Sequence, residues 1–242
     1  MKSSSPNKKS VAYCCHFGWG ENKLDVANYP ERCAKLALSY MRGRSKRRAF
    51  DVGCEIGRSS FELAREFDEV IGIDTSVHLV REAQRLKESG VVYYTIPEEG
   101  EIEISLKKFG LEHASKKVNF WQDDVSAPKP LFSGFDLILA LNIIDKMSDP
   151  KAFLALTADR INKGGLLILS SSYGWDESIT PKEKWIGGYM CDGKEVSTLQ
   201  GLKEILKENF RLIDTKDIPC VFQKGVRQYR YDITQMSIWE RK

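Results

Sequence analysis

The sequence lacks any long hydrophobic run, and it is poor in metal-binding patterns. No apolar stretch approaches the roughly 18 residues of a membrane-spanning helix, and the N-terminus MKSSSPNKKS has no apolar segment of the secretory type. The six cysteines contain no C-x-x-C pair, and the three histidines contain no H-x-x-x-H pair. These absences predict free thiols, no bound metal, no membrane contact and a cytoplasmic location.

A strong excess of charge is also absent, since the formal net charge is only +3 over 242 residues. One basic cluster spans residues 42–48 (RGRSKRR). Aromatic residues do not interleave with these charges, so a solvated loop after a helix is a simpler interpretation than a nucleic-acid surface. We therefore expect no nucleic-acid partner, although an RNA-binding function stays open as an alternative.

Short apolar strands alternate with amphipathic helices along most of the chain. Strands are expected over residues 49–52, 69–73, 118–121, 135–141, 166–171, 210–214 and 233–240, with helices within 24–41, 59–66, 76–86, 150–161 and 197–208. This alternation predicts an α/β fold with a doubly wound, mostly parallel seven-stranded sheet. No helix separates the last two strands, so the C-terminal strand should pair antiparallel.

Two further features define the expected organisation. The segment VVYYTIPEEGEIEISL predicts a hairpin insertion near residues 91–105 with its turn at 97–100. Residues 1–23 are expected to form a flexible segment and lid. Residues 24–242 are expected to form a single domain, since the chain is long enough to bury one full-sized core.

The stretch FDVGCEIGRSSFELA (residues 50–64) predicts a nucleotide-binding turn between a strand and a helix. Asp51 and Glu55 would repel a pyrophosphate, and Cys54 stands where a dinucleotide turn has its middle glycine. No Lys-Ser/Thr pair follows the glycines, which disfavours ATP. The carboxylates suit a cofactor with an ammonium and a sulfonium, so the turn favours S-adenosylmethionine; a hydride-transfer enzyme is the alternative.

Acidic side chains also follow two later strands of the expected sheet. Asp74 is placed to accept both ribose hydroxyls, and Asp124 to accept from the adenine amino group. Asn142 would offer its backbone carbonyl to the cofactor ammonium. The full set of expected cofactor-binding residues is Asp51, Gly53, Cys54, Glu55, Gly57, Ser59, Asp74, Thr75, Asp123, Asp124, Val125 and Asn142.

From residue 24 onward the order of elements resembles that of class I S-adenosylmethionine methyltransferases. The sequence ALNIID after the strand 135–141 lacks the Asn/Asp-Pro-Pro-Tyr tetrapeptide of enzymes that methylate bases or amide nitrogens. A small-molecule acceptor is therefore expected.

Five longer stretches resemble one narrow family, the mercaptohistidine N-methyltransferases found as C-terminal domains of ovothiol sulfoxide synthases. They are FDVGCEIGRSSFELAREFDEVIGID, YTIPEEGE, FWQDD, LNIIDKMSDP and TPKEKWIGGY. The resemblance spans nearly the whole chain. It departs at Asp123, where the family usually has glycine before the aspartate that corresponds to Asp124.

This resemblance implies methylation of an imidazole nitrogen of 5-thiohistidine (4-mercaptohistidine), the last step of ovothiol biosynthesis, with S-adenosylhomocysteine as the second product. A separate iron-dependent sulfoxide synthase and a lyase would supply the substrate. Three alternatives stay open: a methyltransferase for another small molecule, an RNA-binding methyltransferase and a non-catalytic S-adenosylmethionine-binding domain.

The catalytic candidates follow the strand 135–141, where this class places residues between donor and acceptor. Asp145 is expected to accept from the ring N–H opposite the attacking nitrogen, or else to cap the following turn, and the Asn142 side chain could meet the substrate. The expected substrate-binding residues are Tyr13, Phe17, Tyr29, Asp145, Tyr173, Trp175, Trp185, Tyr189, Arg227 and Tyr229. For the aromatic residues the alternative is plain packing, and for Arg227 an exposed strand edge.

Overall fold

The structure, a computed structural model, describes residues 8–110 and 116–242. The flexibility expected for residues 1–7 lies outside the described residues. No helix in the described part of the chain is long and apolar enough to cross a membrane.

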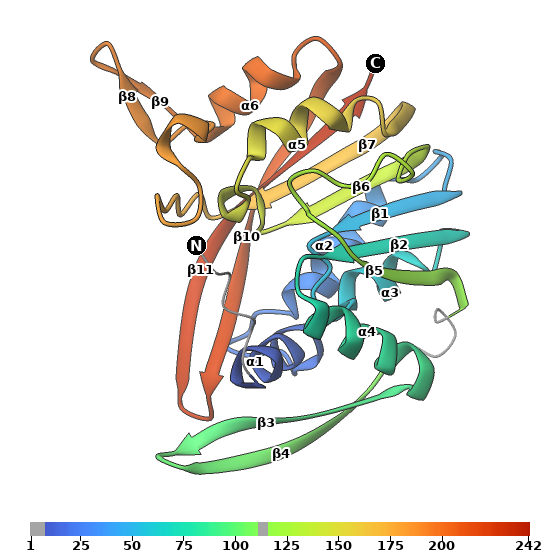
Figure 1. Cartoon of the computed structure of the whole chain (residues 1–242), viewed down its shortest axis with the longest axis vertical. Helices are drawn as coiled ribbons and strands as arrows, with labels where there is room; N and C mark the ends of the chain where they lie inside the picture. The colour runs from blue at the N-terminus through green and yellow to red at the C-terminus, as the bar shows by residue number, and fades with distance from the viewer. Residues whose placement is uncertain (1–7, 111–115) are drawn as a thin grey trace.

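A seven-stranded sheet forms the centre of the molecule, in the order β10-β11-β7-β6-β1-β2-β5 (Figure 1). The strands are β1 (Arg48–Val52), β2 (Glu69–Asp74), β5 (Val118–Gln122), β6 (Phe135–Leu141), β7 (Ile161–Ser171), β10 (Phe210–Gly225) and β11 (Gln228–Arg241). The neighbouring pairs from β5 to β7 are parallel, and β11 runs antiparallel to both β7 and β10. The predicted fold class is confirmed.

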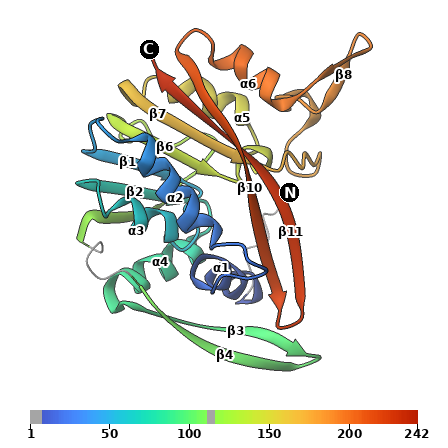
Figure 2. The ribbon, with the colours of Figure 1, turned by 180° about the vertical axis from the view of Figure 1, so that it is seen from behind.

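Helices cover both faces of this sheet (Figures 1 and 2). One core packs α2 (Tyr29–Tyr40), α3 (Arg58–Leu63) and α4 (Val77–Ser89) against the sheet, and the other packs α5 (Pro150–Thr157) and α6 (Thr198–Leu206). Because both faces are covered, β6 reads FDLILAL, which is apolar except for Asp136 and has six of its seven residues buried.

Local capping signals fix where several helices begin. Ser76 accepts from the Leu79 N–H, and Asp149 accepts from the Ala152 N–H. Ser197 and Gln200 form the predicted capping box at the start of α6. These three predicted helix starts are confirmed.

Two long hairpins, called arms below, lie on either side of the N-terminal helix α1 (Lys8–Trp19) (Figure 1). The first arm is the predicted hairpin, β3 (Val91–Glu99) with β4 (Ile102–Phe109). The second is the outer half of β10 and β11, whose tip meets the first arm through a hydrogen bond from the Val226 N–H to the Pro97 carbonyl. On α1, His16 contacts Tyr94 of one arm and Gln223 of the other.

The structure corrects some element boundaries. The predicted strands 210–214 and 233–240 are the inner parts of longer strands, because β10 and β11 continue to pair beyond the sheet. Pro219 is tolerated there because β10 is an edge strand. Helix α1 and the small hairpin of β8 (Tyr189–Cys191) with β9 (Lys194–Val196) were not predicted.

Candidate active site

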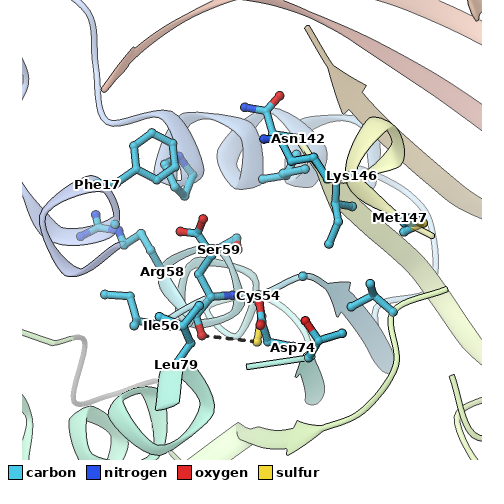
Figure 3. Close-up of a pocket in the computed structure, with 18 of the residues that line it drawn as sticks. Phe17, Cys54, Ile56, Arg58, Ser59, Asp74, Leu79, Asn142, Lys146 and Met147 are labelled. Atoms are coloured by element: carbon cyan, nitrogen blue, oxygen red, sulfur yellow. Dashed lines mark hydrogen bonds between the residues drawn. The ribbon is translucent and has the colours of Figure 1, made fainter. Parts of the chain in front are cut away.

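A cavity of about 540 Å³ opens at the carboxyl ends of β1, β2 and β6 (Figure 3). In parallel α/β sheets this edge is where ligands bind. The cavity brings together most of the predicted cofactor residues and two predicted substrate residues. Those that line it are Gly53, Cys54, Glu55, Ser59, Asp74, Thr75, Asp124, Val125, Asn142, Phe17 and Tyr29.

The turn after β1 is held tightly against neighbouring backbone. The N–H groups of Gly53 and Cys54 both donate to the Ile73 carbonyl of β2. Gly53 has φ +75°, a conformation that favours glycine, and a Cβ built there would lie 2.2 Å from Ile143 Cδ1, so a larger residue would also have to displace that side chain. Glu55 also has positive φ (50°), an uncommon conformation for a glutamate that directs this residue to the cavity.

Asp51 lies beneath the turn rather than on the cavity wall. Its carboxylate accepts from the hydroxyls of Ser59 and Ser60, both at 2.6 Å, at the start of α3. Burial raises the Asp51 pKa to about 6, although the two serine hydrogen bonds oppose the shift. Gly57, with φ +84°, forms the N-cap of α3 and does not line the cavity. Asp51 and Gly57 therefore support the turn without lining the cavity.

Asp74 ends β2 with its carboxylate already oriented. One oxygen accepts from the Ser76 N–H at 2.8 Å and the other from the Glu55 N–H at 3.1 Å. A carboxylate has about four acceptor positions, so two remain for a ligand. Burial raises the pKa of Asp74.

Glu55 and Asp124 complete the acidic lining. Burial and the nearby Asp74 charge raise the Glu55 pKa to about 8, while Lys146 acts in the opposite direction. Asp124 accepts from the Ser126 N–H and lines the cavity. Asp123 is buried elsewhere, where its carboxylate accepts from the Lys129 N–H. Carboxyl groups with raised pKa values are poorly solvated, so a cationic ligand would stabilise their ionised forms.

Asn142 follows β6 in a left-handed conformation, with φ +52°. Its N–H donates to the Ser170 carbonyl at 2.9 Å. The buried side-chain oxygen of Asn142 has no hydrogen-bond partner within the described residues. The acidic lining and this unpaired acceptor fit S-adenosylmethionine, whose ammonium and hydroxyl groups are donors.

Aromatic rings form another wall of the cavity. The Phe17 ring of α1 stacks on Phe222 of β10 at 4.6 Å between centroids, and Tyr13 stacks on the same ring at 6.2 Å from outside the cavity. The Tyr29 hydroxyl is 2.7 Å from Ser170 Oγ and 3.0 Å from Thr234 Oγ1. Because these two hydrogen bonds occupy the hydroxyl, a ligand in the cavity would contact mainly the ring of Tyr29.

Asp145 lies next to the cavity without lining it. It sits in the 3₁₀ turn η2 (Ile144–Lys146), is buried, and accepts from the Gly174 N–H at 2.9 Å. Its other oxygen is buried and has no partner in the described part of the chain. Tyr173 likewise lies outside the cavity wall, and its hydroxyl donates to Gln235.

The remaining predicted substrate residues are not brought to this cavity. Trp175 and Trp185 stack on each other at 5.8 Å, with their N–H groups donated to Thr198 and to the Thr180 carbonyl. Tyr189 lies in β8, beside α6. Arg227 and Tyr229 lie at the tip of the second arm, Arg227 facing Glu98 at 3.9 Å. These placements fit the alternative expectations, which are plain packing for the aromatic residues and an exposed strand edge for Arg227.

Sequence reasoning missed three cavity residues with chemical or steric importance: Arg58, Lys146 and Phe222. Arg58 follows the glycine turn directly, which was an available signal. Its guanidinium pairs with Glu31 and Glu62 and lies 4.7 Å from the Trp19 ring. Phe222 lies beyond the predicted strand, and Lys146 follows the candidate Asp145 in the chain.

The basic cluster lies at the opposite end of β1, which starts at Arg48. Arg44 pairs with Glu240, Lys46 with Glu66 and Arg48 with Glu69. Three of its cations are thus neutralised within the protein, far along the strand from the cavity turn.

Comparisons with known proteins agree with this geometry. A family model described as a methyltransferase domain matches residues 26–209. The comparison with curated proteins gave no match.

Solved structures with the same fold cover most of the chain. The YcgJ protein from Bacillus subtilis is 14% identical, with a TM-score of 0.57 over 87% of this chain and 98% of that chain. The N-methyltransferase NodS from Bradyrhizobium japonicum WM9, in complex with S-adenosyl-L-homocysteine, is 13% identical, with a TM-score of 0.55 over 97% and 99%. The cyclase SpnF is 18% identical, with a TM-score of 0.54 over 88% and 76%.

Proposed function

The chain belongs to the methyltransferase-domain family and is an S-adenosylmethionine-dependent methyltransferase; we propose that its acceptor is a ring nitrogen of thiol-substituted histidine. The reaction would be the last step of ovothiol biosynthesis. One observation carries the proposal: a single cavity combines an acidic donor side with an aromatic wall and the cation of Lys146. A flat ring with an anionic substituent fits such an acceptor side.

The donor side has the groups that S-adenosylmethionine needs. When bound, this cofactor supplies an electrophilic methyl group on a sulfonium. Asp74 would accept from the ribose hydroxyls with its two free lone-pair positions, and Asp124 would accept from the adenine amino group. Glu55 and the carbonyl of Asn142 would hold the ammonium.

The acceptor side would act mainly by orientation. Phe17, Tyr29 and Phe222 present apolar surface to a planar ring and exclude water from it. Holding a ring nitrogen at about 3–3.5 Å from the methyl carbon can supply roughly 7–11 kcal/mol without covalent catalysis. Asp145 would contribute as a positioning residue, because its carboxylate fixes Gly174 beside the turn that carries Lys146.

The surrounding surface supports a small acceptor over RNA. The basic cluster is at the far end of β1 and is largely paired. For the proposed reaction, thiolated histidine would come from a separate iron-dependent sulfoxide synthase and a lyase.

A panel of acceptors tests the proposal. The protein is incubated with methyl-labelled S-adenosylmethionine and thiolated histidine, ordinary histidine or RNA, and the products are fragmented in a mass spectrometer. The expected result is a methyl group on a ring nitrogen of thiolated histidine alone. Transfer to RNA or to ordinary histidine, with none to thiolated histidine, would refute the assignment.

A further inference from the structure

Two cations line the active-site cavity, and they differ in how they are held. Arg58 is fixed by Glu31, Glu62 and the Trp19 ring. The Lys146 ammonium, by contrast, has no hydrogen bond or ion pair within residues 8–110 and 116–242. Lys146 therefore presents to the cavity a positive charge that is held in no ion pair within the described residues.

The backbone after β6 explains why Lys146 faces the cavity. Asn142 adopts φ +52° and turns the chain out of the sheet, and the Lys146 N–H closes the 3₁₀ turn on the Ile143 carbonyl at 2.8 Å. Asp145 points inward to the Gly174 N–H, so the next residue, about 120° further around the turn, points in a different direction and lines the cavity. Figure 3 shows Lys146 beside Asn142, across the cavity from Phe17.

The 3₁₀ turn η2, which carries Lys146, is held in place by contact with the turn after β1. The end of the Ile143 side chain packs directly over Gly53. The charge of Lys146 consequently acts on Glu55, where it opposes the rise in pKa. Lys146 is thus at the junction between the acidic donor side and the aromatic acceptor side.

A free ammonium near a site for a sulfonium is unfavourable unless an anion pairs with the ammonium. The sulfur of thiolated histidine is such an anion once ionised. Resting on the function proposed above, we propose that Lys146 binds the thiolate of the acceptor and selects which atom of the acceptor is methylated. Lys146 is on this view a specificity-determining residue.

The consequence is selective attack by nitrogen. A thiolate is softer and normally a better nucleophile than an imidazole nitrogen, so an unrestrained acceptor would favour methylation on sulfur. A charge-assisted hydrogen bond to Lys146 lowers the electron density available on sulfur and anchors it away from the methyl carbon. The ring, fixed at its sulfur and packed between aromatic side chains, then presents nitrogen.

The test compares Lys146→Met and Lys146→Arg with the control Lys163→Met. Lys163 is an exposed lysine near the N-terminal end of β7, and it does not line the cavity. Calorimetry measures the affinity for S-adenosylhomocysteine, and then the affinity of that complex for thiolated and ordinary histidine across a pH series. Mass spectrometry measures the ratio of N-methyl to S-methyl product.

For Lys146→Met we expect affinity for thiolated histidine to fall roughly 10- to 100-fold and to lose its dependence on thiol ionisation. Affinities for ordinary histidine and S-adenosylhomocysteine should stay within about twofold, the S-methyl fraction should rise, and Lys146→Arg should restore part of the binding. The control should match the wild type.

Two results would overturn the inference. Unchanged affinity and selectivity in Lys146→Met would exclude the thiolate contact. An equal loss of S-adenosylhomocysteine affinity would assign Lys146 to the carboxylate of the donor instead. The proposed function fails separately, if the wild type binds S-adenosylhomocysteine but neither binds nor methylates thiolated histidine.

Discussion

Replacing Glu55 by glutamine should make the ligand-free protein more stable at neutral and alkaline pH. The carboxyl group of Glu55 is held in the cavity beside Asp74, and its pKa is raised from 4.5 to about 8. The ionised form of this carboxyl group therefore lowers the free energy of unfolding of the ligand-free protein, and a cationic ligand would offset that cost.

The sign of the effect follows from proton binding. Between pH 4.5 and about 8 the unfolded chain has released the Glu55 proton, whereas the folded chain retains it. The free energy of unfolding therefore falls as the pH rises through this window and levels off above it. At about 1.4 kcal/mol per pKa unit the whole shift would amount to roughly 5 kcal/mol. Because Glu55 is partly exposed, we expect roughly 1–3 kcal/mol after solvent screening.

Urea denaturation of ligand-free wild type and Glu55→Gln at pH 5, 6.5 and 8 measures this directly. Asp51 contributes a change of the same sign in both proteins, so the difference between them isolates Glu55. That difference should grow with pH in favour of the variant, while the exposed control Glu204→Gln follows the wild type. A difference that does not change with pH would refute the reasoning.

The same group should release a proton when S-adenosylhomocysteine binds, because the ligand ammonium favours the ionised carboxylate. Calorimetry at pH 7 in two buffers of different ionisation enthalpy counts the released protons. Wild type should release more protons than Glu55→Gln. Equal release would show that Glu55 does not face the ammonium.

Three further changes probe the donor side, the aromatic wall and the turn. Asp74→Ala should weaken S-adenosylhomocysteine binding by roughly 2–4 kcal/mol in calorimetry; tight NAD binding without S-adenosylhomocysteine binding would overturn the cofactor assignment. Phe222→Ala removes the ring stacked on Phe17 and should lower the free energy of unfolding by about 3 kcal/mol, measured in urea; no loss would show that the stack carries little energy. Asp145→Ala frees the Gly174 N–H and should slow methyl transfer while raising the S-methyl fraction, read by mass spectrometry; unchanged rate and selectivity would remove Asp145 from the mechanism.

Most of the sheet and several helix starts could be predicted because their signals are local. Ser76, Asp149 and Ser197 each cap a helix within three or four residues of chain. The acidic residues Asp74 and Asp124 follow strands whose carboxyl ends must meet at one edge of a parallel sheet. Their approach to one cavity follows from topology alone.

Helix α1 and the long arms depend on contacts far apart in the sequence. His16 contacts Tyr94 and Gln223, which are 78 and 207 residues away. The arm that carries Arg227 extends well past the end of β7, so a residue expected near the substrate lies at a distant tip. Strand length here is set by the pairing of β10 with β11, which residue patterns do not fix.

The choice between Asp145 and Lys146 shows most clearly where sequence reasoning ends. The sequence predicts that the segment after β6 carries chemistry, but adjacent residues of a 3₁₀ turn point about 120° apart. Which of them faces the cavity depends on the φ of Asn142 and on the packing of Ile143 against Gly53. The absence of a side chain at Gly53 thus affects both the donor side and the acceptor side of the cavity. It shapes the donor turn, and it leaves space for the Ile143 side chain of the segment in which Asp145 accepts from the Gly174 N–H and Lys146 lines the cavity. On the proposal made above, this steric relation between two loops decides which acceptor atom meets the methyl group.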